Sequence, residues 1–105
     1  MTAKTPRMAQ IEAMLADEPN DPELRYFLAM EWLSAGDEPT ALTKFRELTG
    51  NSTYVPAFLI AGQVLNRLGQ VEEACAILRT GIEAARQQGN AHAQGEMQGL
   101  LDSIE

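Results

Sequence analysis

The chain has little of what covalent or metal chemistry needs. Its 105 residues include one cysteine, Cys75, and one histidine, His92. One cysteine cannot form an internal disulfide, and one Cys with one His cannot complete a zinc site. No phosphate-binding glycine loop, nucleophile elbow or metal-ligand spacing occurs. The sequence therefore predicts no catalytic residue, no metal, no cofactor and no enzymatic activity, with Cys75 a buried structural residue and His92 a solvated one.

Positive charge is also scarce. Eight Lys and Arg residues stand against fifteen Asp and Glu, which gives a formal net charge of −7. Such an acidic surface repels phosphate groups, so we expect no binding of nucleic acid or of anionic membranes. No apolar run approaches the roughly 20 residues that span a bilayer, and the start, Met1-Thr2-Ala3-Lys4, lacks a signal-peptide core. We therefore expect a cytoplasmic protein.

Residues that favour strands are few. Aromatic residues make up 6% of the chain, which has only three valines and five isoleucines. Strands favour β-branched and aromatic residues, whereas helices favour unbranched ones that lose little rotamer freedom. Since no segment alternates strictly between apolar and polar residues, the sequence predicts an all-α fold.

Capping residues, prolines and glycines divide the chain into helices. Thr5-Pro6 and Asp21-Pro22 each combine an N-cap with a proline at the first helical position. Gly36, Gly69 and Gly89 supply the left-handed residue that ends a helix. The short connections between helices predict antiparallel hairpins. Six helices are expected, at residues 6–18, 22–35, 38–48, 55–68, 71–88 and 91–104.

The sequence resembles itself at a shift of 33 residues. This shift aligns Gly36 with Gly69 and Ala41 with Ala74. A fixed period of this size is typical of stacked helical hairpins. Small residues at repeated positions let two helices approach closely, while large ones fill the space between hairpins.

The repeated residues resemble the tetratricopeptide repeat family. The first repeat has Arg25, Leu28, Ala29, Trp32, Gly36, Ala41 and Phe45, and the second has Phe58, Ala61, Gly62, Leu65, Gly69, Ala74 and Leu78. Several positions depart from the pattern. Arg25 replaces a large apolar residue, Ala61 is smaller than the usual leucine, and Gly81 interrupts the fifth helix. The proline expected between the two repeats is missing, and Pro56 lies one turn later.

This resemblance implies a right-handed α–α superhelix of antiparallel helical hairpins. It divides a single domain, residues 1–105, into an N-terminal helix at 6–18, repeats at 22–49 and 55–88, and a C-terminal capping helix at 91–104. The two end helices carry apolar stripes, Met8, Ile11, Met14 and Leu15 in the first, and Ala93, Met97, Leu100, Leu101 and Ile104 in the last. Gly95 and Gly99 either let the last helix lie very close to a neighbour or are weak spots, since each glycine costs up to roughly 1 kcal/mol against alanine.

The resemblance also implies where a partner binds. In this family the first helices of successive hairpins line a concave groove that holds an extended peptide or a partner helix. The corresponding residues here are Glu23, Tyr26, Met30, Leu33, Leu59, Gln63, Asn66 and Arg67. Tyr26 and Met30 take two places of the lysine-asparagine-arginine clamp with which some members bind a C-terminal carboxylate, so we do not expect that clamp. The alternative to a partner surface is that neighbouring helices and the terminal segments of the chain cover Tyr26 and Met30.

Two functions stay open. The first is a non-catalytic interaction module that binds a peptide or helix of another protein, and the acidic perimeter favours a partner segment with some basic residues. The second is a self-associating structural unit, a homodimer formed through the apolar groove or through the ends of the array.

Overall fold

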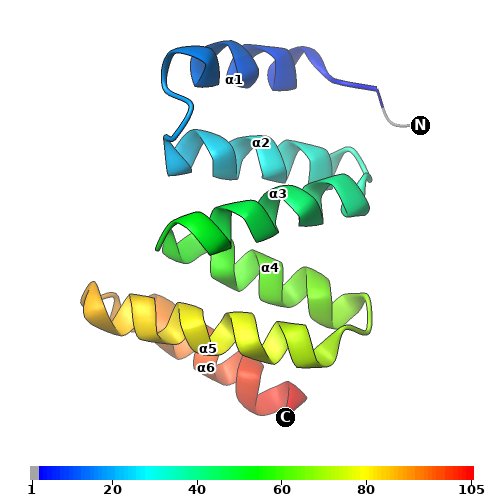
Figure 1. Ribbon diagram of the computed structural model, residues 1–105. Coiled ribbons are helices and arrows are strands. Elements are labelled where there is room, and N and C mark those ends of the chain that lie inside the picture. The colour runs from blue at the N-terminus through cyan, green and yellow to red at the C-terminus, as the bar shows by residue number, and fades with distance from the viewer. Residues whose placement is uncertain (1–2) are drawn as a thin grey trace. The chain divides into compact units, whose positions relative to one another are not determined.

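The protein is all-helical in a computed structural model that describes residues 3–105. Met1 and Thr2, on which the signal-peptide expectation partly rests, lie outside the described residues. The described chain forms helices and no strand, which confirms the all-α prediction (Figure 1). The helices are α1 Pro6–Asp17, α2 Pro22–Ser34, α3 Glu38–Asn51, α4 Val55–Arg67, α5 Val71–Gln87 and α6 Ala91–Ile104.

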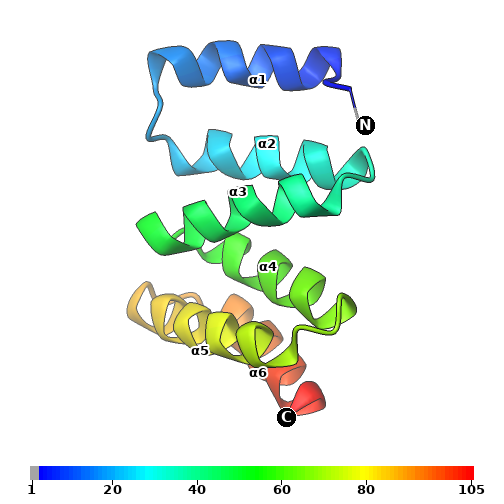
Figure 2. The ribbon, with the colours of Figure 1, turned by 45° about the vertical axis from the view of Figure 1, so that its right-hand side comes forward.

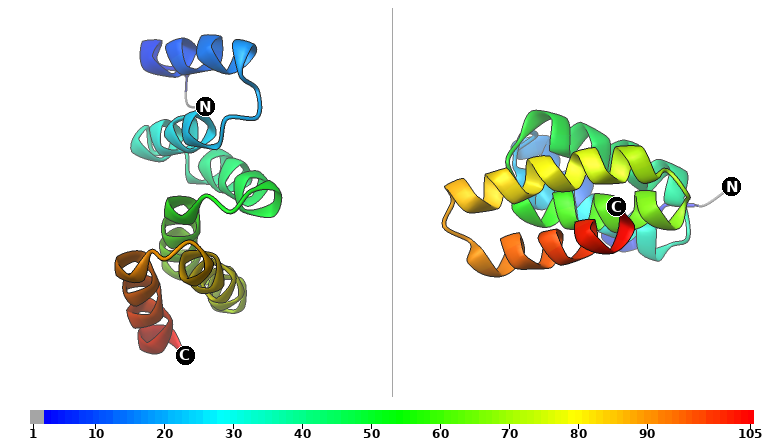
Figure 3. Two further views of the ribbon diagram at one scale, coloured as in Figure 1. Left: turned by 90° about the vertical axis from the view of Figure 1, so that its left-hand side faces the viewer. Right: turned by 90° about the horizontal axis from the view of Figure 1, so that it is seen from below.

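The helices fall into two compact units. The first ends at Ser52 and contains α1 to α3, and the second, Thr53–Glu105, contains α4 to α6. In the first unit α2 packs against α1 and α3, and Figure 2 shows α2 and α3 running antiparallel. In the second unit α5 packs against α4 and α6, which also contact each other, and Figure 3 shows α5 and α6 side by side. The assignment of a single domain with two repeats and a cap stays a prediction.

Side-chain caps start most of the helices. Thr5 Oγ1 accepts a hydrogen bond from the Met8 amide at 3.1 Å at the start of α1. At the start of α2 the Asp21 carboxylate accepts from two amides, at 2.9 and 3.2 Å. Asp37 and Asn90 cap α3 and α6 in the same way, each at 3.1 Å. These bonds satisfy amides that have no partner inside a helix, and they confirm the predicted starts of these four helices.

Three helices end in the same hydrogen-bonded turn. Gly36, Gly69 and Gly89 have φ angles of 87°, 81° and 71°, a region that L side chains rarely adopt. After α2, the Gly36 amide donates to the Leu33 carbonyl and the Asp37 amide to the Trp32 carbonyl, both at 3.1 Å. Corresponding pairs of bonds follow α4 and α5. This is the Schellman arrangement, and it makes each glycine the end of its helix as predicted.

Helix α3 ends later than the sequence suggested. We expected it to stop near Leu48, but it continues through Gly50 to Asn51. The Asn51 side-chain amide donates to the Glu47 carbonyl, and Ser52 Oγ donates to the Leu48 carbonyl, both at 2.9 Å. These bonds satisfy carbonyls of the last turn, so the helix continues through a glycine that does not adopt a positive φ.

The core of the second unit gathers apolar side chains from all three of its helices. Phe58 from α4, Leu78 from α5 and Met97 from α6 are almost completely buried. The predicted stripe of α6 packs here, with Met97 and Leu101 buried and the remaining members, Ala93, Leu100 and Ile104, packed against the cluster. This stripe is therefore confirmed.

Glycines set how closely the helices of the second unit approach one another. A Cβ added to Gly62 on α4 would lie 2.6 Å from Leu78 Cδ2 on α5. Gly81, which we interpreted as an interruption of α5, is buried where α5 meets α4 and α6, because its Cβ would overlap Phe58 and Met97. A Cβ on Gly95 or Gly99 meets nothing within 4 Å. Gly95 and Gly99 therefore allow no close helix contact, and they weaken α6 as the second of the two alternatives predicts.

Candidate functional site

The four predicted groove residues of the first repeat all lie on α2. Glu23 is exposed, and Tyr26, Met30 and Leu33 are half-buried. Their spacing of three or four residues gives one side of the helix a continuous row, which we call the α2 strip. Neighbouring groups therefore cover part of each apolar member, while part of its surface remains accessible.

Tyr26 also contributes to packing between α2 and α3. Its ring lies 6.2 Å from that of the fully buried Phe45 in an edge-to-face arrangement, and 6.1 Å from that of Phe27. Aromatic pairs in such geometries contribute beyond the area that they bury. Partial burial raises the pKa of the Tyr26 phenol above its ordinary value of 10.0. Tyr26 thus has a structural role in addition to any role at a surface.

The four residues of the second repeat lie on α4 and form a more polar row, the α4 strip. Gln63 and Arg67 are exposed, and Asn66 is half-buried. Leu59 is half-buried and packs against the core of the second unit. The α4 strip therefore presents mainly amide and guanidinium groups, whereas the α2 strip presents mainly apolar ones.

Several exposed apolar side chains are not in the predicted strips. Met14 on α1 is 54% exposed and Phe27 on α2 is 41% exposed, while Leu68 and Val71 are exposed around the turn between α4 and α5. We assigned Met14 to the apolar stripe of the first helix, and for this residue the burial that such a stripe predicts is wrong. Met8 and Ile11 of the same stripe are buried. The exposure of Phe27 has a reason that is visible in the sequence. Helix α2 is apolar on nearly all sides, so its neighbours cannot cover every apolar side chain.

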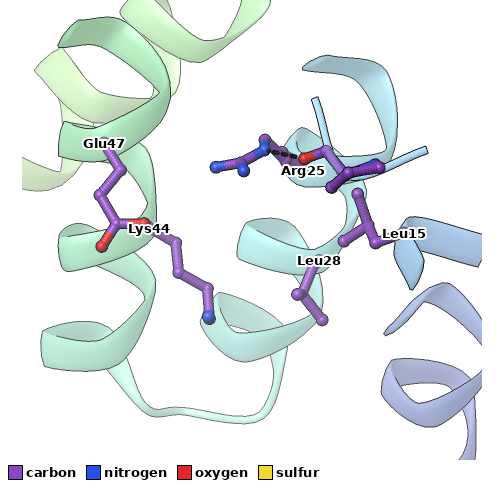
Figure 4. Close-up of a pocket in the computed structure, with 6 residues that line it drawn as sticks. Leu15, Arg25, Leu28, Lys44 and Glu47 are labelled. Carbon is purple, nitrogen blue, oxygen red and sulfur yellow. Dashed lines mark hydrogen bonds between the residues drawn. The ribbon is translucent and has the colours of Figure 1, made fainter. Parts of the chain in front are cut away.

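A cavity in the first unit was not predicted. It has a volume of about 240 Å³ and is lined by Leu15, Pro19, Arg25, Leu28, Lys44 and Glu47 (Figure 4). Arg25 Nε donates a 2.6 Å hydrogen bond to the Pro19 carbonyl. The only signal in the sequence was that Arg25 replaces the large apolar residue usual at its position.

Two solved structures of a tetratricopeptide repeat domain protein from Salinibacter ruber are similar to this chain. A crystal structure is 31% identical, with a TM-score of 0.76 over 81% of this chain and 96% of that chain. A solution NMR structure is 33% identical, with a TM-score of 0.78 over 83% of this chain and 89% of that chain. This chain belongs to the tetratricopeptide repeat family.

A third similar structure supports the fold alone. It is a solution structure of a protein from Bordetella parapertussis that is 24% identical, with a TM-score of 0.75 over 96% of this chain and 89% of that chain. No family model matches the chain, and no curated protein matches it.

The small and the large residues of the tetratricopeptide repeat pattern are buried within each unit. In the first unit the small residues Ala29 and Ala41 are completely buried, and so is Phe45. In the second unit Ala61 and Ala74 are completely buried, and so are the large Leu65 and Leu78. The paired small and large residues that suggested the family are thus the residues that fill each core.

The two side chains of this tetratricopeptide repeat chain that are most suited to chemistry, Cys75 and His92, lie on different helices, α5 and α6. Cys75 is buried in the core of the second unit, as predicted. His92 is exposed, as predicted, and its Nε2 lies 3.0 Å from a carboxylate oxygen of Glu96. Among residues 3–105 no group of three or more His, Cys, Asp or Glu side chains is arranged to hold a metal ion. No helix in the described part of the chain is long and apolar enough to cross a membrane.

Proposed function

We propose that this tetratricopeptide repeat protein is a non-catalytic interaction module that binds a peptide or helix of another protein. The observation that carries the proposal is the α2 strip, where Tyr26, Met30 and Leu33 form a half-buried apolar row. Membership of the family supports it, because this fold is typical of protein-interaction modules. We propose partner contacts on the α2 strip of the first unit and, separately, on the α4 strip of the second unit.

The charge of the chain indicates the chemistry of the partner. With a formal net charge of −7, the protein attracts segments that carry Lys or Arg and repels acidic ones. Glu23 is exposed beside the apolar members of the α2 strip, so it can pair with a cation at the edge of a bound segment. The favoured partner is an amphipathic segment with an apolar face and basic flanks.

Partner capture with strip variants tests the proposal. Full-length protein is immobilised and used to capture binding proteins from lysate of its native cells. We expect Met30→Gln and the charge reversal Glu23→Lys each to reduce recovery of the captured protein, and Tyr26→Ser with Met30→Gln to abolish it. The matched control is Met14→Gln, which makes an exposed apolar residue outside the strips polar.

Helical content is measured for every variant, because Tyr26 also packs against Phe45. Unchanged capture by well-folded strip variants would contradict the proposal. Turnover of any substrate that depends on Cys75 or His92 would contradict its non-catalytic part.

Self-association is the second candidate, and one observation favours it. Met14 is 54% exposed on α1, the first helix of the described chain, and an apolar side chain of this size is suited to contact with a second copy. We then expect light scattering to show a dimer that dissociates on dilution and that Met14→Gln weakens. A strictly monomeric species at all concentrations would exclude this candidate.

A further inference from the structure

The cavity of the first unit brings two cations to an apolar wall. Leu15, Pro19 and Leu28 supply the apolar lining, while Arg25 from α2 and Lys44 from α3 supply the charges. Figure 4 shows both cationic side chains extending into the space between these two helices. A concave apolar surface with a few convergent polar groups is the usual form of a small-molecule site.

Neither cation of the cavity has a carboxylate partner in the described chain. Other cations of the described chain do have such partners, for example in the pairs Lys4–Glu12, Arg7–Glu31, Arg79–Glu105 and Arg86–Glu83. By contrast, Arg25 Nε donates to the Pro19 carbonyl. Figure 4 shows the end of its guanidinium group pointing towards α3, so its remaining N–H groups can donate to a ligand. Among residues 3–105, Lys44 makes no ion pair. In a chain with nearly twice as many acidic as basic residues, two cations without an ion-pair partner at one cavity indicate a place for an external anion.

The charge of the lining sets the charge of the ligand. Arg25 and Lys44 carry two positive charges and Glu47 carries one negative charge, so the lining has a formal charge of +1. One carboxylate balances this charge, whereas a phosphate dianion exceeds it. A planar carboxylate also matches the paired N–H groups of a guanidinium.

The volume and the apolar wall set the rest of the ligand. A cavity of about 240 Å³ holds about eight groups of the size of water, at roughly 30 Å³ each. We propose that this cavity binds a small organic monocarboxylate with a short apolar chain, whose carboxylate contacts Arg25 and Lys44 and whose chain lies on Leu15 and Leu28. The site is separate from the proposed partner surface, since no residue of the α2 or α4 strip lines it.

Titration with hexanoate tests the proposal. Its carboxylate and short chain contain about eight non-hydrogen atoms, and a ligand of this size binds with a Kd on the order of 1 mM at good complementarity. Binding to the full-length protein is followed by amide chemical shifts in NMR spectra. We expect saturable shifts centred on residues around Arg25, Leu28 and Lys44. Hexanamide, which has the same shape without the charge, should bind at least about tenfold more weakly.

Variants separate the cavity from general charge effects. Arg25→Gln and Lys44→Gln should each weaken hexanoate binding about tenfold, since each removes a charged hydrogen-bond donor. The matched control is Lys4→Gln, which removes an exposed cation paired with Glu12 outside the cavity, and we expect it to leave binding unchanged. Glu47→Gln should strengthen binding about threefold, because it removes the negative charge of the lining.

The Glu47→Gln variant keeps the test valid even where Arg25→Gln disturbs folding, because it predicts a gain. Saturable hexanoate shifts that the two cation variants weaken and Glu47→Gln strengthens support the site. Absence of saturable shifts, equal binding of hexanamide, tighter binding of inorganic phosphate than of hexanoate, or equal loss in Lys4→Gln would each overturn it.

Discussion

Gly81 on α5 lies so close to α4 that a Cβ added to it would lie 2.5 Å from the Cβ of Phe58. The same added atom would lie 2.6 Å from Met97 Sδ on α6. Phe58 Cβ is the stem of a buried ring and cannot move away without moving its backbone. The packing of three helices in the second unit therefore depends on the absence of a single methyl group.

Replacing Gly81 by alanine should destabilise the protein. Overpacking of a dense core costs about 1–3 kcal/mol, which exceeds the gain in helix propensity of up to about 1 kcal/mol from removing a glycine. Urea unfolding followed by circular dichroism measures the difference. A Gly81→Ala variant as stable as the parent would mean that the three helices do not approach as closely as described.

The matched substitutions at Gly95 and Gly99 should have the opposite sign. Both glycines lie within α6, and an added Cβ has open space around it. Alanine at each position should stabilise the protein by about 0.5–1 kcal/mol, because glycine loses more backbone freedom on folding. The same urea measurement applies. Destabilisation by either variant would show that this face of α6 is covered.

The carboxyl group of Glu83 should titrate unusually low. A hydrogen bond from Arg86 and a second from Gln87 lower its pKa from 4.5 to about 2. Because the folded pKa is depressed, this contribution to stability is present above pH 4.5 and is lost as the pH falls through about 2. NMR titration of the Glu83 carboxyl carbon checks it. Arg86→Gln should raise the pKa towards 4.5 and Gln87→Ala should raise it less, whereas a pKa of 4.5 in the parent would refute the pairing.

Cys75 should be protected from thiol reagents in the folded state. Its side chain lies in the core of the second unit and is 7% exposed, so a reagent reaches it only when that unit opens. Reaction with a chromogenic disulfide should be slower than in urea by on the order of 100-fold or more. Equal rates in the two conditions would show that the thiol lies at the surface.

Local chemistry explains what the sequence predicted well. An N-cap such as Asp21 and a left-handed glycine such as Gly36 act through hydrogen bonds to residues within a few positions. Such signals are visible in the sequence itself, so four helix starts and the three glycine turns agree with the prediction. The end of α3 was predicted too early, although its cause is also local. The side chains of Asn51 and Ser52 donate to carbonyls of the last turn and extend the helix through Gly50.

Contacts between distant residues explain what the sequence did not predict. Gly81 and Gly99 look alike in the sequence, and only the presence of Phe58 and Met97 beside one of them gives the two opposite effects. The cavity lined by Arg25 and Lys44 likewise depends on how α2 packs beside α3, which the position of either residue in the sequence does not reveal. The predicted strips were placed by their helical spacing, but spacing alone did not reveal that Tyr26 also packs on Phe45.

The most direct test of the proposed function is photo-crosslinking from single exposed positions in the native cell. A photoreactive amino acid is placed at Glu23 or Gln63 in the strips, and at Thr43 or Thr80 on α3 and α5 as matched controls. We predict a covalent adduct with another protein from Glu23 and Gln63 and none from the two threonine positions. Equal adducts from all four positions, adducts only from the controls, or adducts only between two copies of this chain would contradict the account.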